Sequence, residues 1–198
     1  MTDPRTIDAY NDRSEEYEKK FDNDAPGPHL LAFMNMLPKG GSVLDLGCGT
    51  GGSCAHMVNS GFDVTGMDAS KEMLKLAETK TEAKFIHATF DELNTTSFFD
   101  GIWANFSLLH AKRSDLPKHL KSIHRALKPE GVFHIGMKTG DGSARDKIDR
   151  FYTYYTEAEL LKTLENAGFQ DFQITHGDGQ GLAGKVEPWM IVLAKSAT

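Results

Sequence analysis

The sequence has very little cysteine. Among its 198 residues there are only Cys48 and Cys54, six positions apart around a glycine-rich segment. Two thiols cannot build a disulfide scaffold, and their spacing is not that of a zinc site. The histidines are scattered along the chain without metal-ligand spacing. We therefore expect free thiols in a reducing compartment and no bound metal.

Long apolar runs and clusters of basic residues are missing as well. No stretch approaches the roughly 20 apolar residues that a membrane-spanning helix needs, and the N-terminal residues lack the apolar core of a signal peptide. The net charge is -6, whereas a nucleic-acid surface needs clustered Lys and Arg. These absences predict a cytoplasmic protein with neither a membrane nor a nucleic acid as partner.

The patterning that is present indicates one α/β domain. The apolar and charged fractions, 39% and 25%, are near globular norms, and the length suits one sizeable core. Helical stretches at about 52–60, 70–80 and 114–127 alternate with short apolar runs at 42–46, 62–67, 84–88, 100–106 and 131–138. Such alternation predicts a parallel sheet with helices on both faces.

The two ends of the chain depart from this alternation. Apolar and aromatic residues at helical spacing predict one N-terminal helix that ends in the breaker cluster 22–28. Near the C-terminus, apolar runs at 169–175 and 188–194 have no helix between them, which predicts an antiparallel pair at the sheet edge. The glycine-rich segment 176–184 is expected to be irregular.

The strongest functional signal is a strand that runs into the turn 47–52, Gly-Cys-Gly-Thr-Gly-Gly, and then into a helix. Because glycine has no Cβ, such a turn lets the backbone approach a ligand closely. The next strand ends at Asp68, which in a doubly wound sheet faces the same crevice and can accept bonds from ribose hydroxyls. An adenine nucleoside ligand is therefore predicted.

Spacing alone does not identify that ligand. Gly47, Gly49 and Gly52 satisfy the dinucleotide pattern G-x-G-x-x-G, and Asp68 stands at the expected offset. A nicotinamide cofactor and adenosylmethionine both fit. A merely tight turn, with Asp68 as a solvated strand end, also fits.

Four motifs in order resemble those of class I, S-adenosylmethionine-dependent methyltransferases of the small-molecule type. They lie at 43–51 (VLDLGCGTG), 61–70 (GFDVTGMDAS), 99–104 (FDGIWA) and 127–132 (LKPEGV). The resemblance implies a Rossmann-like, doubly wound sheet of seven strands in the order 3-2-1-4-5-7-6, with the last strand antiparallel and helices on both faces. It also implies S-adenosyl-L-methionine as cofactor and S-adenosyl-L-homocysteine as product.

The resemblance assigns roles around the glycine turn. Asp45 would orient the amino-acid end of the cofactor, although a carboxylate here could instead cap backbone amides of the turn. Gly47, Cys48, Gly49 and Gly51 would form the cofactor-binding turn itself.

Further roles follow for the second and third strands. Asp68 would bind the ribose, and Ala69 and Met73 would line the adenine, although Met73 is also an ordinary core residue for an amphipathic helix. Relatives often have an aspartate where Thr89 stands, so Thr89 and Phe90 are the expected, less typical adenine contacts.

The remaining candidates surround the transferred methyl group. Asn105 and Phe106 follow the fourth strand and are expected to contact the cofactor. His110 is a candidate base and substrate contact, with a purely structural histidine as the alternative. Tyr10 and Tyr17 lie about two helical turns apart, on one face of a helix that resembles a lid. Tyr10 is expected to be catalytic and Tyr17 to bind cofactor; core packing is the alternative for both.

A last group follows the fifth strand. Arg150, Tyr152 and Tyr154 combine a guanidinium with aromatic rings and are expected to bind a planar or anionic acceptor, or else to pack a loop onto the sheet. The predicted single domain, 1–198, comprises a lid at 1–38, a cofactor-binding core at 40–140, and a substrate loop, helix and edge hairpin at 141–198.

The predicted activity is methyl transfer to a small-molecule acceptor by in-line displacement, by a monomer or homodimer. Two alternatives stay open at this stage. One is a nicotinamide-dependent oxidoreductase, and the other is a non-catalytic protein that binds S-adenosylmethionine.

Overall fold

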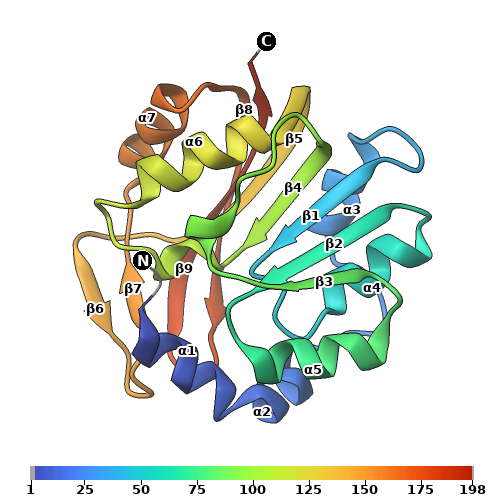
Figure 1. Cartoon of the computed structure of the whole chain (residues 1–198). Helices are drawn as coiled ribbons and strands as arrows, with labels where there is room; N and C mark the ends of the chain where they lie inside the picture. Colours follow the sequence, from blue (N-terminus) through green and yellow to red (C-terminus); the bar gives the residue numbers. More distant parts are fainter. Residues whose placement is uncertain (1–2, 198) are drawn as a thin grey trace.

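The centre of the protein is a seven-stranded sheet with the order β3-β2-β1-β4-β5-β9-β8 (Figure 1). The computed structural model describes residues 3–197; the first two residues and the last one, which the predicted domain includes, lie outside this range. Across the sheet the strands are β3 (Lys84–His87), β2 (Asp63–Asp68), β1 (Ser42–Leu46), β4 (Phe99–Asn105), β5 (Leu127–Lys138), β9 (Val186–Ser196) and β8 (Phe169–Gln180). The first five run parallel, and β9 runs antiparallel to both neighbours. The predicted sheet order is confirmed.

Helices cover both faces of the sheet, as predicted. On one face lie α3 (Pro28–Asn35), α4 (Gly52–Asn59) and α5 (Lys71–Lys80), which share a buried apolar cluster with β1 and β2. On the other face, α6 (Leu116–Ala126) and α7 (Glu157–Asn166) pack with β4, β5 and β9 in a second and larger cluster. The central strands β1, β4 and β5 are therefore buried on two sides, which explains their apolar sequences, whereas the edge strand β3 is mostly exposed.

Capping residues fix where two of these helices begin. The Ser70 hydroxyl accepts a hydrogen bond from the Met73 amide at the start of α5. At α7, Thr156 and Glu159 form a capping box in which the Glu159 carboxylate accepts from the Thr156 amide. Each cap satisfies backbone donors that the first helical turn leaves unpaired. Both helices were predicted, α5 at about 70–80 and α7 within 141–198.

The single predicted N-terminal helix is wrong, because the chain bends there. It forms α1 (Pro4–Asn11) and α2 (Ser14–Phe21), with a turn at Asp12 and Arg13 between them. Asp3, at the start of α1, pairs with Arg145 at 2.7 Å, whereas Glu18 of α2 pairs with Lys80 of α5 at 2.9 Å. The bend thus lets two short helices cross the carboxyl ends of the strands (Figure 1).

Strands occupy part of the predicted substrate loop and of the glycine-rich segment 176–184, which was expected to be irregular. Within 138–150 lies β6 (Ser143–Arg145), which pairs with β7 (Phe151–Thr153) in a separate two-stranded sheet. The segment 176–184 also departs from expectation, because β8 continues through Gln180 and pairs with β9 up to Val186. Tertiary pairing with β9 overrides the low strand propensity of glycine here.

Residues 3–197 contain no helix that is long and apolar enough to cross a membrane. In the same part of the chain, no group of three or more His, Cys, Asp or Glu side chains gathers in a way that could hold a metal ion. Cys48 and Cys54 are both free and buried.

Candidate functional site

Two adjoining cavities lie at the carboxyl ends of the parallel strands. The inner cavity is lined by the glycine turn, the end of β2 and residues beyond β3 and β4, including Gly47, Gly49, Asp68, Ala69, Ser70, Met73, Phe90, Ser107 and His110. The outer cavity, about 470 Å³, extends to β5, β7 and the β8–β9 hairpin, with Lys138, Arg150, Tyr152, Glu187 and Trp189 in its walls. Tyr10, Tyr17, Asn105 and Phe106 line both and mark the junction.

Ser107 and α5 pack closely against two glycines of the turn. Gly47 has a φ of +81°, and a Cβ on it would lie 2.3 Å from the Cβ of Ser107. Gly51 has a φ of +78°, and a Cβ there would lie 2.8 Å from the Cβ of Ala77 on α5. Gly51 lines neither cavity, so its role is to bring α4 close to α5. Gly47 lines the inner cavity directly.

Asp68, at the end of β2, is held rigidly beside this turn. Its carboxylate accepts hydrogen bonds from the backbone amides of Gly49 at 2.9 Å and Ser70 at 2.8 Å. Burial raises the pKa of this carboxyl group despite these bonds. A carboxylate has about four acceptor sites, so Asp68 keeps capacity to accept further bonds from within the inner cavity.

Asp45 is a buried carboxylate without a cationic partner among the described side chains. It is 2% exposed and lines neither cavity, and the Cys54 thiol donates to it at 3.3 Å. Burial raises its pKa from 3.8 to about 7. A group in this state binds a proton or a nearby cation readily, because either one relieves the desolvated charge.

The predicted adenine contacts divide into two groups. Ala69, Met73 and Phe90 line the inner cavity, although Met73 is only 2% exposed and also packs in the interior. Thr89 lines neither cavity. Its amide and hydroxyl both bond the Glu92 carboxylate, at 2.8 and 3.0 Å, where they cap the short helix η1 (Phe90–Glu92).

Tyr10 closes the junction of the cavities through a chain of hydrogen bonds. Its hydroxyl lies 2.8 Å from Nε2 of His110 and accepts from Nη1 of Arg150 at 3.0 Å. Nδ1 of His110 lies 2.6 Å from the carbonyl oxygen of Phe151. Because a carbonyl only accepts, Nδ1 must carry the proton, and Nε2 then accepts from the Tyr10 hydroxyl.

This chain of hydrogen bonds leaves His110 poorly suited to act as a base. Its Nε2 lone pair is already engaged by Tyr10, and burial lowers its pKa to about 3. Burial also raises the pKa of the Tyr10 hydroxyl. Both groups therefore stay neutral near pH 7, and their geometry serves to hold α1 over the site.

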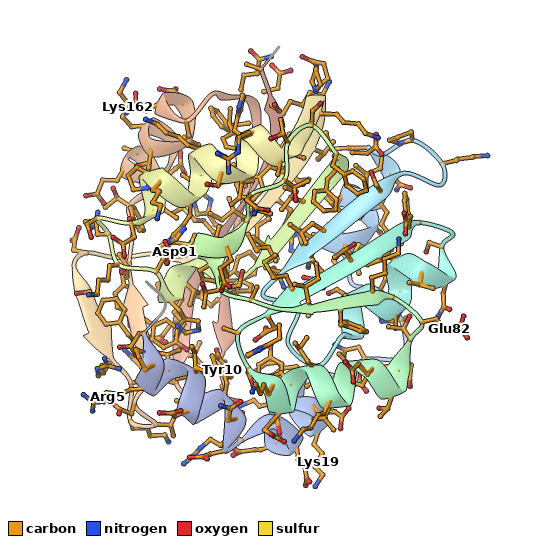
Figure 2. All side chains as sticks on the ribbon, viewed as in Figure 1. Arg5, Tyr10, Lys19, Glu82, Asp91 and Lys162 are labelled. Carbon is orange, nitrogen blue, oxygen red and sulfur yellow. The ribbon has the colours of Figure 1, made fainter. Side chains whose placement is uncertain are left out.

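Several further contacts fix α1 and α2 as a cover. The Tyr17 ring packs edge-on against Tyr10, with centroids 5.9 Å apart, and its Cε1 lies 3.6 Å from the position of a Cβ on Gly49. Arg5 of α1 bonds the Asp149 carboxylate at 2.6 Å. Figure 2 places Tyr10 between α1 and the strands, whereas Lys19 lies at the periphery.

The outer cavity contains two buried ion pairs. Arg150, only 3% exposed, donates to the Asp146 carboxylate at 2.7 Å. Lys138 pairs with Glu187, whose other oxygen accepts from the Tyr154 hydroxyl at 3.3 Å. Arg150 and Tyr152, both expected to bind the acceptor, line the outer cavity. Tyr154 lines neither cavity and contacts Glu187 from outside it.

Asn105 is exposed at the junction and has an unexpected partner. Its Oδ1 lies 3.0 Å from Nε2 of His134, a fully buried histidine on β5 whose ring stacks on Trp103 at a centroid distance of 3.5 Å. Oδ1 is an acceptor, so Nε2 of His134 donates and the Asn105 amide N–H groups remain available.

Sequence reasoning did not find His134, Ser107, Lys138, Glu187 or Trp189. Ser107 donates to the carbonyl of Leu46 at 2.5 Å and so ties the end of β1 to the residue after β4. Its position two residues after Asn105 was an available signal. The parallel pairing of β4 and β5 brings His134 to Asn105. Lys138, Glu187 and Trp189 lie on β5 and β9, and only the antiparallel pairing of these strands brings them together.

Comparisons with known proteins agree with this geometry. Residues 43–131 match the family model described as a methyltransferase domain. YqeM of Bacillus subtilis, named as a methyltransferase, is 37% identical over 103 residues, covering 48% of this chain and 42% of its own length. The malonyl-[acyl-carrier protein] O-methyltransferase of Pseudescherichia vulneris is 35% identical over 93 residues, covering 46% of this chain and 36% of its own. The matched segment thus spans about two fifths of these relatives.

A solved structure extends the similarity over the whole fold. It is the 1,6-didemethyltoxoflavin-N1-methyltransferase of Burkholderia thailandensis with bound 1,6-didemethyltoxoflavin and S-adenosylhomocysteine. The TM-score is 0.79 at 25% identity, covering 98% of this chain and 88% of that one. Its ordered motifs, its sheet and these similarities are those of the class I S-adenosylmethionine-dependent methyltransferases.

Proposed function

We propose that the chain binds S-adenosylmethionine in the inner cavity and the adjoining junction, and transfers its methyl group to a small molecule in the outer cavity. The observation that carries this proposal is Asp68. Its carboxylate is fixed by two backbone amides, keeps acceptor capacity, and lines a cavity next to the glycine turn. Ribose hydroxyls are the donors that such a group fits.

Asp45 supports the same ligand at its other end. A desolvated carboxylate whose pKa is about 7 gains stability from a nearby cation. The ammonium group of S-adenosylmethionine is such a cation and has N–H groups to donate. The nicotinamide ring is uncharged in NADH and, although cationic in NAD+, has no N–H on its ring nitrogen. This electrostatic fit favours S-adenosylmethionine over a nicotinamide cofactor.

Bound S-adenosylmethionine supplies a methyl group already activated by its sulfonium. The task of the chain is therefore to align the acceptor and to exclude water. Tyr10, Tyr17 and Phe106 surround the junction with rings, and Asn105 presents amide donors there. We assign His110 to positioning Tyr10, since its own lone pair is engaged.

The proposal is tested by calorimetric titration with S-adenosylhomocysteine and, separately, with NADH. We expect binding of the first alone, and Asp68→Ala weakens it roughly tenfold to a hundredfold, since charge-assisted hydrogen bonds are worth about 1.5–3 kcal/mol. Asp63→Ala is the matched control, because Asp63 is exposed at the other end of β2. Binding of NADH alone, or equal affinity in the Asp68 variant, contradicts the proposal.

A further inference from the structure

The glycine-rich end of β8 has a regular design that the proposed function does not use. Gly177 and Gly179 stand two residues apart, so both face the same side of the strand. Neither has a positive φ, so backbone conformation does not demand glycine at these positions. Glycine inside a strand weakens it unless something must approach closely.

The group that approaches closely is the indole of Trp189. A Cβ on Gly177 would lie 2.3 Å from Cζ2 of Trp189, and a Cβ on Gly179 would lie 3.0 Å from its Nε1. Trp189 is also the register partner of Gly177 on β9. The indole therefore rests on the bare backbone of β8, and a side chain at Gly177 or Gly179 would push it away.

This indole forms part of the outer cavity wall. Trp189 is half-buried and lines that cavity, and Phe106 and His29 meet it edge-on at centroid distances of 6.2 and 5.7 Å. These two edge-on rings and the β8 backbone at Gly177 and Gly179 keep the indole in one orientation. The result is a preformed aromatic surface in the wall of the outer cavity.

A polar pair lies next to this ring. Lys138 is the register partner of Trp189 across β5 and β9, and Glu187 precedes Trp189 by two residues on the same face. Lys138 and Glu187 pair with each other, and the Lys138 ammonium lies 3.8 Å from the Tyr152 ring centroid. Lys185 reaches the same carboxylate at 3.2 Å, so the cluster presents N–H donors beside a carboxylate oxygen acceptor.

We propose that the outer cavity takes a planar heteroaromatic acceptor. Its ring packs on Trp189, and a polar edge with a ring carbonyl beside a ring N–H bonds Lys138 and Glu187. The carbonyl accepts from the Lys138 ammonium, and the N–H donates to the Glu187 carboxylate. This inference rests on the proposed function and specifies its acceptor class; an aliphatic acid or amine would use only the polar pair and leave the ring unmatched.

The chain offers a direct optical test, because Trp103 and Trp189 are its only tryptophans. Protein saturated with S-adenosylhomocysteine is titrated with 1,6-didemethyltoxoflavin and with pteridine-2,4-dione, and tryptophan emission is followed. We expect saturable quenching in the parent chain. In Trp189→Phe, whose remaining tryptophan is buried and stacked on His134, most of the quenching disappears.

Affinity is then measured by calorimetry on two variants that remove the surface in different ways. Trp189→Leu deletes the aromatic face, and Gly179→Ala leaves the tryptophan in place but displaces its ring. Both weaken binding of the ring compounds roughly threefold to tenfold, the range expected for one aromatic pair. Asp178→Ala, an exposed neighbour on the opposite side of β8, controls for damage to the strand and leaves affinity unchanged.

Three results overturn the proposal. The first is that neither ring compound binds at millimolar concentration to protein that binds S-adenosylhomocysteine. The second is unchanged affinity in Trp189→Leu, and the third is tighter binding of malonate or phosphoethanolamine than of both ring compounds. If S-adenosylhomocysteine itself does not bind, the proposed function fails instead, so the two failures are distinguishable.

Discussion

Asp45→Asn should stabilise the free protein while it impairs cofactor binding. Burial raises the pKa of Asp45 from 3.8 to about 7. Between these two pH values the folded protein keeps the carboxyl group protonated, whereas the unfolded chain has released the proton. The favourable contribution of this group is complete below about pH 4 and is lost as the pH rises to about 7. Above pH 7 the folded protein carries the buried charge in full.

The magnitude follows from the two pKa values. A difference of about 3 pH units at about 1.36 kcal/mol each gives on the order of 4 kcal/mol as an upper limit. For a chain of this size about 1 kcal/mol shifts the melting temperature by roughly 2–4 °C. Asp45→Asn therefore melts several degrees above the parent chain near pH 8.5, and the difference shrinks toward pH 5.

The assay is thermal unfolding of both chains from about pH 5 to about pH 8.5, with and without S-adenosylhomocysteine. Titrations of other groups are common to both chains and cancel in the difference. Asp141→Asn, an exposed site, shows what removal of a surface charge does. The added ligand should stabilise the parent chain more than the Asp45→Asn variant, because a nearby ammonium group lowers the cost of the buried carboxylate charge. A melting difference that is absent, reversed or independent of pH would falsify this account.

Two further predictions concern packing and positioning. Gly51→Ala should unfold several degrees below its control, Gly61→Ala. Both glycines have a positive φ, but a Cβ at Gly51 would lie 2.8 Å from Ala77 of α5, whereas a Cβ at Gly61 meets open space. Equal melting temperatures would refute the packing role of Gly51. His134→Phe keeps an aromatic ring beneath the site but removes the hydrogen bond to Asn105, so methyl transfer should slow roughly tenfold, about one hydrogen bond. The same change in an Asn105→Ala background should have no further effect, and an additive loss would show that His134 acts by another route.

Local sequence determined the cofactor half of the site and the frame around it. Short-range patterns predict the strand, glycine turn and helix at residues 42–59 and the strand that ends at Asp68, because the steric and hydrogen-bonding rules involved operate within one βαβ unit. A parallel sheet then brings the glycine turn and Asp68 to the same edge. The order of the seven strands came from the resemblance of four motifs, and the structure agrees with it.

Patterns of the same kind were misleading where a distant partner intervenes. Thr89 occupied the expected adenine position, but Glu92 engages its amide and hydroxyl in a cap. The glycines of β8 predicted an irregular loop, because nothing near them in sequence reveals that Trp189 lies across them. In both cases a specific contact outweighed residue propensity.

The outer cavity, where we propose that the acceptor binds, was decided by tertiary structure alone. Lys138, Glu187 and Trp189 lie side by side only because β9 inserts between β5 and β8 and runs antiparallel to both. The sequence suggests a base at His110, but burial and a hydrogen bond to Tyr10, a hundred residues away, keep its imidazole neutral. We therefore assign it a positioning role. Charge state depends on desolvation and on partners in space, and no local pattern in a sequence contains either of them.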